Sequence, residues 1–177
     1  RCFYEKTGQR GSMEILSRVL GDGSRGMTRE ETNRKANLAG VNLNTVFYPS
    51  GRASARFANQ LLCVRIETTG EYSKKALEIL SDTVFFPTPD EIYIKSAKAR
   101  TAAILREKAQ KPAYMTHDEL FGKMMPLHPY RFDPVGKLED IEYIGLFDLM
   151  EAARRVFNPQ NLIFSVRSCL EPEQVFD

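Results

Sequence analysis

The sequence predicts an α+β domain in which an antiparallel sheet carries helices packed on one face. Two segments rich in β-branched and aromatic residues, 41–48 and 55–69, follow one another with only a short break between them. Helical periodicity dominates most of the remaining chain, and its segments come in groups instead of alternating one by one with strands. Adjacent strands with grouped helices are typical of an α+β architecture.

The composition indicates one soluble globular domain. The chain has 177 residues, of which 42% are hydrophobic and 27% charged. Its net charge is +2, from 25 basic and 23 acidic residues, so we expect no nucleic-acid partner. No run approaches the roughly 18 apolar residues that a membrane span needs, and the first residues show no signal-peptide core.

The cysteines predict neither a disulfide framework nor a metal site. Cys2, Cys63 and Cys169 are few, odd in number and widely separated. No two of them form a Cys-x-x-Cys pair. Cys63 lies in an apolar run, so we expect it to be a small core residue.

Helical spacing of apolar residues and glycine signals define the first half of the chain. A helix is predicted over 12–21, ended by a glycine-rich stretch. A capping box at Thr28 and Glu31 predicts a second helix to residue 39, which Gly40 ends. The two strands then follow, joined by the turn 49–51.

Three helices are predicted after the strands. A polar entry at Glu71 leads into the first of them. Thr88 is the expected N-cap of a long second helix, with Pro89 at its first position and Glu91 three residues after the cap. This helix is expected to continue without interruption to about residue 110, because no breaker precedes Pro112.

A second capping box, Thr116 with Glu119, predicts the third of these helices. Residues 126–143 contain several prolines and are expected to be irregular. A last helix over 146–156 and a strand over 162–166 complete the predicted elements. We expect one core to contain Leu80, Val84, Ile104, Leu149 and Phe164.

Four segments carry a resemblance to a known family. They are 76–91, the Ile-Leu-Arg-Glu run at 104–107, the proline-rich segment 127–136, and 156–166. In that order and at those intervals, the chain resembles one half-domain of the pitrilysin/insulinase (inverzincin) family of zinc metallopeptidases, which includes mitochondrial processing peptidase-like proteins. The resemblance implies a metallopeptidase half-domain fold of the LuxS/processing-peptidase-like kind.

The resemblance does not extend to the family's metal site. Active members carry His-x-x-Glu-His on an early helix, which supplies two zinc ligands and a general base. Neither of the two histidines here, His117 and His128, lies in such a motif. When the glycine pair that follows the motif in the family is aligned with Gly23-Ser24, the degenerate counterparts are Glu14, Ser17 and Arg18. Arginine stays protonated and cannot serve as a ligand.

Glu107 matches the family's third zinc ligand, and Arg100 stands where the family has a further glutamate. Catalytic zinc takes three protein ligands, so Glu107 alone is not expected to bind it. Glu107 is then either a solvated helix carboxylate or a partner of Arg18 or Arg100. We expect no catalytic, cofactor-binding or metal-binding residue in this chain.

The stretch 21–26 matches Gly-x-Gly-x-x-Gly, the pattern of dinucleotide-binding turns. Such a turn must follow a strand, whereas this one follows a predicted helix. A helix C-cap and a flexible turn are therefore predicted.

The resemblance implies a catalytically silent half of a peptidase chamber, giving wall, closure and dimer interface. The partner would be a second half-domain, in cis or in trans, that carries the zinc and cuts peptides in the shared chamber. Residues 1–177 would then form a single half-domain, either alone or as a fragment of a longer two-half protein. The alternatives are a non-proteolytic structural subunit, like the core proteins of a respiratory complex, and an unrelated α+β binding module.

Overall fold

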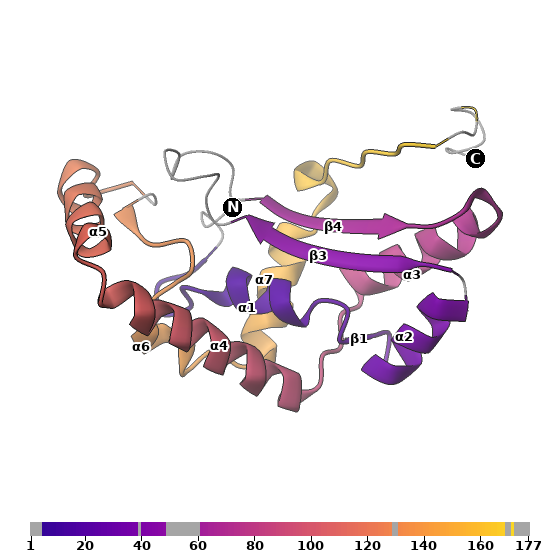
Figure 1. The fold of residues 1–177 in the computed structure, drawn as a ribbon, viewed down its shortest axis with the longest axis horizontal. Helices are drawn as coiled ribbons and strands as arrows, with labels where there is room; N and C mark the ends of the chain where they lie inside the picture. The colour runs from indigo at the N-terminus through magenta and orange to yellow at the C-terminus, as the bar shows by residue number, and fades with distance from the viewer. Residues whose placement is uncertain (1–4, 39, 49–60, 129–130, 169–170, 172–177) are drawn as a thin grey trace.

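The computed structural model describes residues 5–38, 40–48, 61–128, 131–168 and 171. Its larger sheet is an antiparallel pair that lies over a layer of helices, which confirms the α+β prediction (Figure 1). The strands are β1 (Gly23–Ser24), β2 (Met27–Thr28), β3 (Asn42–Tyr48) and β4 (Leu61–Glu67). The α-helices are α1 (Ser12–Val19), α2 (Arg29–Leu38), α3 (Ser73–Phe85), α4 (Glu91–Ala109), α5 (Pro112–Met124), α6 (Leu138–Ile141) and α7 (Leu146–Val156), with short 3-10 turns at Gly70–Tyr72 and Pro159–Asn161.

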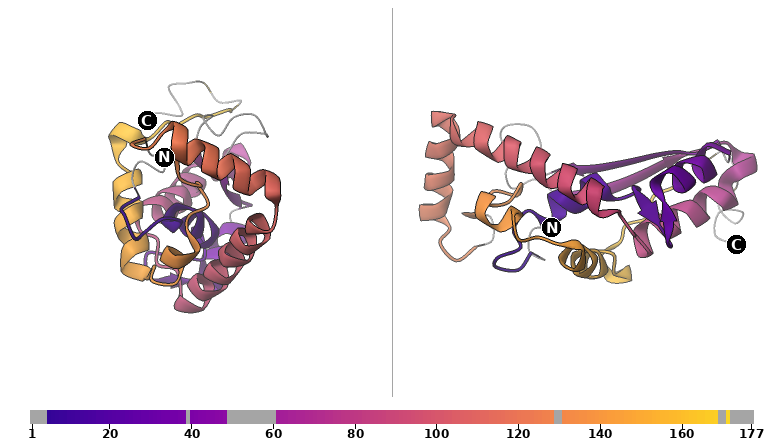
Figure 2. Two further views of the ribbon diagram at one scale, coloured as in Figure 1. Left: turned by 90° about the vertical axis from the view of Figure 1, so that its left-hand side faces the viewer. Right: turned by 90° about the horizontal axis from the view of Figure 1, so that it is seen from below.

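The molecule is elongated, with α5 at one end and α2 and α3 at the other (Figure 2). Helix α1 lies in the middle and contacts α4, α7 and β3. Its apolar residues Met13, Ile15, Leu16 and Val19 are all buried in the main core. Burying one such side chain stabilises the fold by about 1.5–3 kcal/mol. The apolar residues of α1 therefore contribute much of the energy that packs α4, α7 and β3 around this helix.

The sheet shows the alternation expected of a strand pair with one covered face. β3 and β4 pair from Asn42 opposite Glu67 to Tyr48 opposite Leu61. Leu62 and Val64 pack against the main core, whereas Cys63 is exposed and free. The core position expected for Cys63 is therefore wrong, because successive strand residues point to opposite faces. The predicted turn 49–51 lies outside the described residues.

Two glycines allow the start of α1 to pack closely against the loop before α6. Gly11 and Gly136 both have positive φ, 100° and 114°. A Cβ on Gly136 would stand 2.5 Å from the Cα of Gly11 and 2.6 Å from the carbonyl oxygen of Arg10. The two backbones therefore approach as closely as only glycine allows.

The first turn of α1 is closed by a side chain from outside the helix. Glu5 accepts hydrogen bonds from the backbone N–H groups of Gly11, at 3.1 Å, and of Met13, at 2.9 Å. Gly11, at the N-cap position, has no side chain to make these bonds. Burial raises the pKa of the Glu5 carboxyl to about 7, although the hydrogen bonds oppose the rise.

The glycine-rich stretch 21–26 contains a tight hairpin. Gly21 has φ of 97° just after the end of α1, which agrees with the predicted C-cap. Arg25 and Gly26, with φ of 52° and 78°, form the two-residue loop between β1 and β2. Positive φ at both loop residues is the type I′ pattern of hairpins. The hairpin pairs with the segment before α4 through a bridge between Ser24 and Pro87, so the turn is held in place.

This pairing explains why α4 begins later than predicted. Thr88 is not the N-cap, because its Oγ1 accepts a hydrogen bond from the N–H of Gly26 at 3.1 Å, and its own N–H donates to Gly23. Asp90 is the cap and accepts from Ile92 N–H at 3.4 Å. Pro89 accordingly precedes the helix. The prediction of one uninterrupted helix ending before Pro112 is confirmed.

Of the three predicted capping boxes, at Thr28, Thr88 and Thr116, only the first is confirmed. At the start of α2, Glu31 Oε2 accepts from Thr28 N–H at 2.8 Å, and Thr28 Oγ1 accepts from Glu31 N–H at 3.3 Å. The box at Thr116 is wrong, because α5 already begins at Pro112, a residue well suited to the first helical turn. Thr116 lies inside the helix and donates its hydroxyl to the Pro112 carbonyl at 3.0 Å.

The predicted core is confirmed in four of its five members. Val84 and Leu149 are buried, and Leu80 and Ile104 pack against the same cluster. Phe164 is 56% exposed, so its assignment to the core is wrong. Beyond the 3-10 turn at Pro159–Asn161, residues 162–168 run extended without joining either sheet, so the predicted strand 162–166 is also wrong (Figure 1). An extended apolar segment becomes a strand only when a neighbour supplies hydrogen bonds.

Candidate functional site

The three residues at the degenerate motif positions lie together on α1. The Glu14 carboxylate forms an ion pair with the Arg18 guanidinium one turn later. The Glu14 side chain is only 7% exposed and that of Arg18 is 26% exposed. Ser17 donates its hydroxyl to the Glu14 backbone carbonyl at 2.7 Å. The polar atoms at these positions are therefore largely engaged with one another within the same helix.

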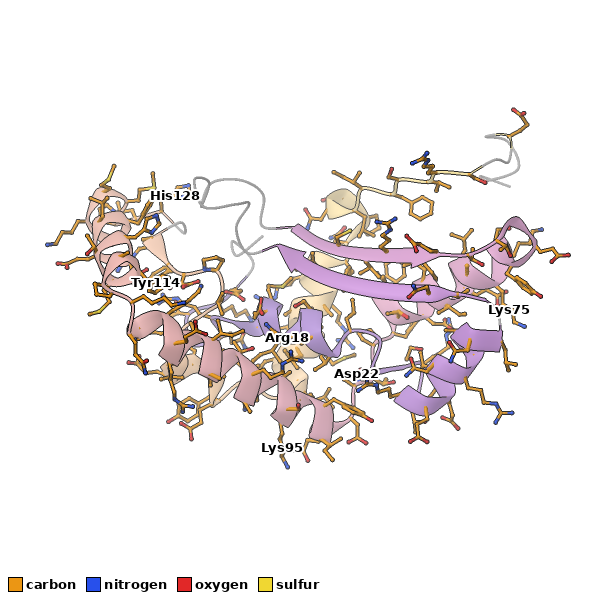
Figure 3. The ribbon with its side chains drawn as sticks, viewed as in Figure 1. Arg18, Asp22, Lys75, Lys95, Tyr114 and His128 are labelled. Atoms are coloured by element: carbon orange, nitrogen blue, oxygen red, sulfur yellow. The ribbon has the colours of Figure 1, made fainter. Side chains whose placement is uncertain are left out.

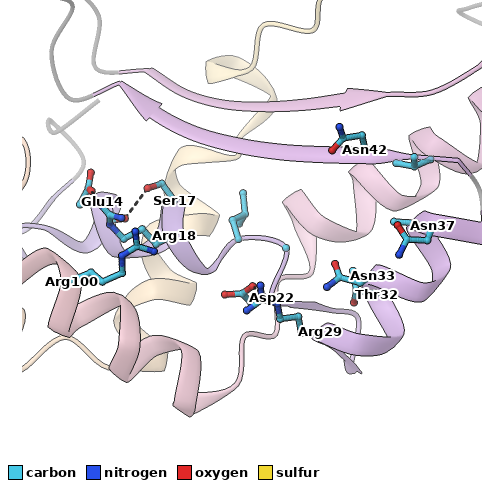
Figure 4. A pocket seen from close by; sticks show the side chains of 14 residues that line it. Glu14, Ser17, Arg18, Asp22, Arg29, Thr32, Asn33, Asn37, Asn42 and Arg100 are labelled. Carbon is cyan, nitrogen blue, oxygen red and sulfur yellow. Dashed lines mark hydrogen bonds and ion pairs between the residues drawn. The ribbon is translucent and has the colours of Figure 1, made fainter.

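Arg100 approaches this group from α4, which packs against α1. Figure 4 shows Arg100 beside Arg18 at one end of a pocket. Within the described part of the chain, Arg100 forms no ion pair with any carboxylate. Arg100 thus brings a second guanidinium group to the Arg18 end of the pocket.

Glu107 does not join this group. It accepts a hydrogen bond from Lys111 Nζ at 2.6 Å, and its side chain is 67% exposed. The hydrogen bond from Lys111 and the lysine's charge lower the pKa of Glu107. Glu107 is therefore a solvated helix carboxylate, as one of the two interpretations expected. The other interpretation, a partnership with Arg18 or Arg100, is wrong.

The histidines are also remote from the motif positions. His117 lies on α5, where its ring centroid is 4.4 Å from that of Phe121. Figure 3 shows His128 at the α5 end of the molecule, well away from Arg18. Neither histidine lines the pocket beside Glu14.

The residues present do not fit a zinc ion. Among the described residues, no three His, Cys, Asp or Glu side chains come close enough to hold a metal. The Glu14 carboxylate is already neutralised by Arg18, and Arg100 adds a second fixed positive charge. A divalent cation at these positions would meet net repulsion as well as too few ligands.

The pocket itself has a volume of about 550 Å³ and lies between α1, α2, α4 and the start of β3. Arg29 of α2 pairs with Asp22 at 3.3 Å in its middle. Burial raises the pKa of the Asp22 carboxyl, and the charge of Arg29 opposes that rise. The wall opposite Arg18 and Arg100 is made by Thr32, Asn33, Asn37 and Asn42 (Figure 4).

Sequence reasoning missed this wall because its residues come from separate elements. One signal was present in the predicted second helix. Thr32 and Ala36 have helical spacing and are buried, and Asn33 and Asn37 follow each of them by one residue. A polar stripe next to a buried stripe indicates an amphipathic helix whose margin borders a cavity.

Comparisons with known proteins place the fold. No protein-family model matches the sequence, and no curated protein does. A protease from Helicobacter pylori has a similar structure, with a TM-score of 0.72 and 20% sequence identity over 96% of this chain and 39% of that one. A peptidase M16 inactive domain from Pseudomonas fluorescens is similar with a TM-score of 0.65 and 16% identity, over 81% of this chain and 33% of that one.

The chain thus has the fold of M16 peptidase domains and spans well under half the length of these two structures. At such identities the likeness concerns the fold alone. No helix in the described ranges has both the length and the apolar character that crossing a membrane requires.

Proposed function

We propose that this chain is a catalytically silent half of a pitrilysin/insulinase-type peptidase chamber. In this role it supplies a wall of the chamber, helps to close it, and forms the interface with a second half-domain of the same fold. That second half, in the same polypeptide or in another, binds the zinc ion and cuts peptides.

The observation that carries this proposal is the Glu14–Arg18 ion pair with Arg100 beside it. A zinc ligand must offer a lone pair, which a protonated guanidinium lacks. The central position of α1 leaves little freedom for these groups to rearrange around a metal, since nearly the whole helix is buried. Peptide-bond chemistry that depends on zinc must therefore come from another half.

The sheet supports the need for a mate. The outer edges of a two-stranded sheet present unpaired N–H and C=O groups that a further strand or another domain can cover. The face of β4 that points away from the helices carries Cys63, Arg65 and Glu67, all exposed. A polar outer face suits the wet wall of a chamber better than a buried contact, so the mate would dock along sheet edges and helix ends.

Peptide hydrolysis tests the proposal. The purified protein is assayed alone, and then mixed with a catalytic half of the same fold class. We expect no cleavage by the protein alone and chelator-sensitive cleavage in the mixture. Chelator-sensitive cleavage by the protein alone would overturn the proposal, and no cleavage in either sample would favour the structural-subunit alternative.

Metal analysis gives an independent measurement. We expect no stoichiometric zinc in the dialysed protein. About one zinc per chain that is lost in Glu107→Ala would contradict the silent-half assignment. The triple substitution Glu14→His, Ser17→Glu and Arg18→His is expected to remain inactive, because ligand orientation also requires supporting hydrogen bonds and catalysis requires the opposing half.

A further inference from the structure

We propose that the pocket between α1, α2, α4 and β3 binds a small polar organic anion, held through its carboxylate or phosphate group by Arg18 and Arg100. This site goes beyond the silent-half role. It needs no partner half, and it uses the cationic groups that make the motif positions unsuitable for zinc.

The charge balance of the pocket favours an anion. The described residues of its lining include three arginines and two carboxylates. Asp22 pairs with Arg29, and Glu14 pairs with Arg18. Arg100 is left without a carboxylate in the described chain, so the pocket carries one uncompensated positive charge.

Arg18 has donor capacity to spare. A guanidinium offers five N–H donors in a planar fork that matches the two oxygens of a carboxylate or phosphate. Among the described residues, only Nη2 of Arg18 donates a hydrogen bond, to Glu14, while its Nε is buried and has no partner there. Because Arg100 lies beside Arg18 at the same end of the pocket, an anionic group there would meet two guanidiniums at once (Figure 4).

The opposite wall defines the rest of the ligand. Asn33, Asn37 and Asn42 present amide groups, which both donate and accept hydrogen bonds. Among the described residues that line the pocket there is no aromatic side chain, so they offer no surface on which a nucleobase would stack. The volume of about 550 Å³ lies within the range of small-molecule sites. Hydroxyl-bearing carboxylates and sugar phosphates fit this combination.

Calorimetric titration of the folded protein at low ionic strength tests the site. The probes are citrate, glucose 6-phosphate and inorganic phosphate, with glucose as the neutral control. We expect saturable binding of citrate or of the sugar phosphate and none of glucose. Which of the two organic probes binds more tightly identifies the anionic group, and tighter binding of inorganic phosphate than of either would overturn the organic part of the proposal.

Two substitutions locate the binding. Arg100→Gln is expected to weaken binding at least about tenfold, equivalent to about 1.4 kcal/mol. Asn33→Asp, which adds a negative charge to the opposite wall with little change of shape, is expected to weaken it as well. Both residues are exposed, so folding should be retained, as circular dichroism would verify.

Arg106→Gln is the matched control, because Arg106 is an exposed arginine of the same helix outside the pocket. We expect its affinity to stay within about twofold of the unaltered protein, less than about 0.4 kcal/mol. Equal weakening by Arg106→Gln and Arg100→Gln would show non-specific attraction and overturn the proposal. The absence of saturable binding by every probe up to about 10 mM, a free energy weaker than about −3 kcal/mol, would overturn it as well.

Discussion

Two glutamate–cation pairs include the residues that the sequence resemblance compared with zinc ligands, Glu14, Arg18 and Glu107, and they differ in almost everything except spacing. Glu14 and Arg18 on α1, and Glu107 and Lys111 at the end of α4, are both four residues apart. The carboxylate of the first pair is nearly buried, whereas both side chains of the second are more than 60% exposed. The same sequence relationship therefore gives an internal element of the fold in one case and a solvated surface contact in the other.

The difference comes from tertiary packing. Helix α1 is surrounded by α4, α7 and β3, so a charge placed on it must be compensated inside the molecule. Glu107 and Lys111 lie where α4 passes into α5. Because both side chains are exposed there, water solvates their charges and the pair adds little to stability. The comparison teaches that burial, which spacing does not encode, decides whether such an ion pair matters for stability.

The largest expected loss of stability comes from disturbing the close contact between the start of α1 and the loop before α6. Gly136→Ala would place a Cβ 2.5 Å from the Cα of Gly11, at a φ that side chains rarely adopt. Overlap and backbone strain together should cost about 3 kcal/mol or more. Gly26→Ala is the control, because Gly26 also has positive φ but a Cβ there meets open space. Denaturant unfolding should show a loss of about 1 kcal/mol in the control, and equal losses would contradict the packing argument.

The second prediction compares the two pairs directly. Arg18→Gln should destabilise the protein by about 2–3 kcal/mol, because it leaves the buried Glu14 carboxylate uncompensated. Lys111→Gln should not shift the denaturation midpoint measurably. Adding Glu14→Gln to Arg18→Gln should recover part of the loss, which a double-mutant cycle would measure. If neither Arg18→Gln nor Lys111→Gln shifted the denaturation midpoint, Arg18 would not be the residue that compensates the charge of Glu14.

Sequence reasoning located most helices because their signals are local. The long helix α4 was predicted from a capping signal at its start and the absence of breakers, and the start of α2 from its Thr28–Glu31 capping box. The start of α4 was misplaced by two residues because Thr88 and Asp90 are both good caps. The choice between them depends on the hairpin bonds to Thr88, which no local pattern shows.

The site was less predictable than the fold. The resemblance located Glu14 and Arg18, but the pocket beside them also needs Asp22, Arg29 and the asparagines of α2. These residues meet only after α1, α2 and α4 have packed together. The prediction of a strand at 162–166 was wrong for a related reason, since its composition was suitable but no strand among the described residues pairs with it.

The third prediction concerns a buried carboxyl that has hydrogen bonds in place of a cation. Burial raises the pKa of Glu5 from 4.5 to about 7, so the folded protein binds more protons than the unfolded chain between these values. Stability should therefore fall as pH rises through this window, by about 1–2 kcal/mol, and level off above it. Glu5→Gln keeps an acceptor for Met13 N–H without the charge. The free energy of unfolding of Glu5→Gln, relative to that of the unaltered protein, should rise from about pH 4.5 to pH 7. A difference that stays constant across this range would refute the raised pKa of Glu5.

The smallest expected effects lie at the entry of α4, the helix that carries the exposed pair. Asp90→Ala removes the side chain that caps Ile92 N–H, and Thr88→Ala removes the acceptor for Gly26 N–H. Each should cost about 0.5–1 kcal/mol, since both bonds are near the surface. The two substitutions should loosen different segments of the chain. Hydrogen exchange in Asp90→Ala should accelerate in the first turn of α4, whereas in Thr88→Ala it should accelerate at Gly26 in the hairpin. Faster exchange in the first turn of α4 for Thr88→Ala would restore Thr88 as the cap and remove the tertiary explanation for the late start of the helix.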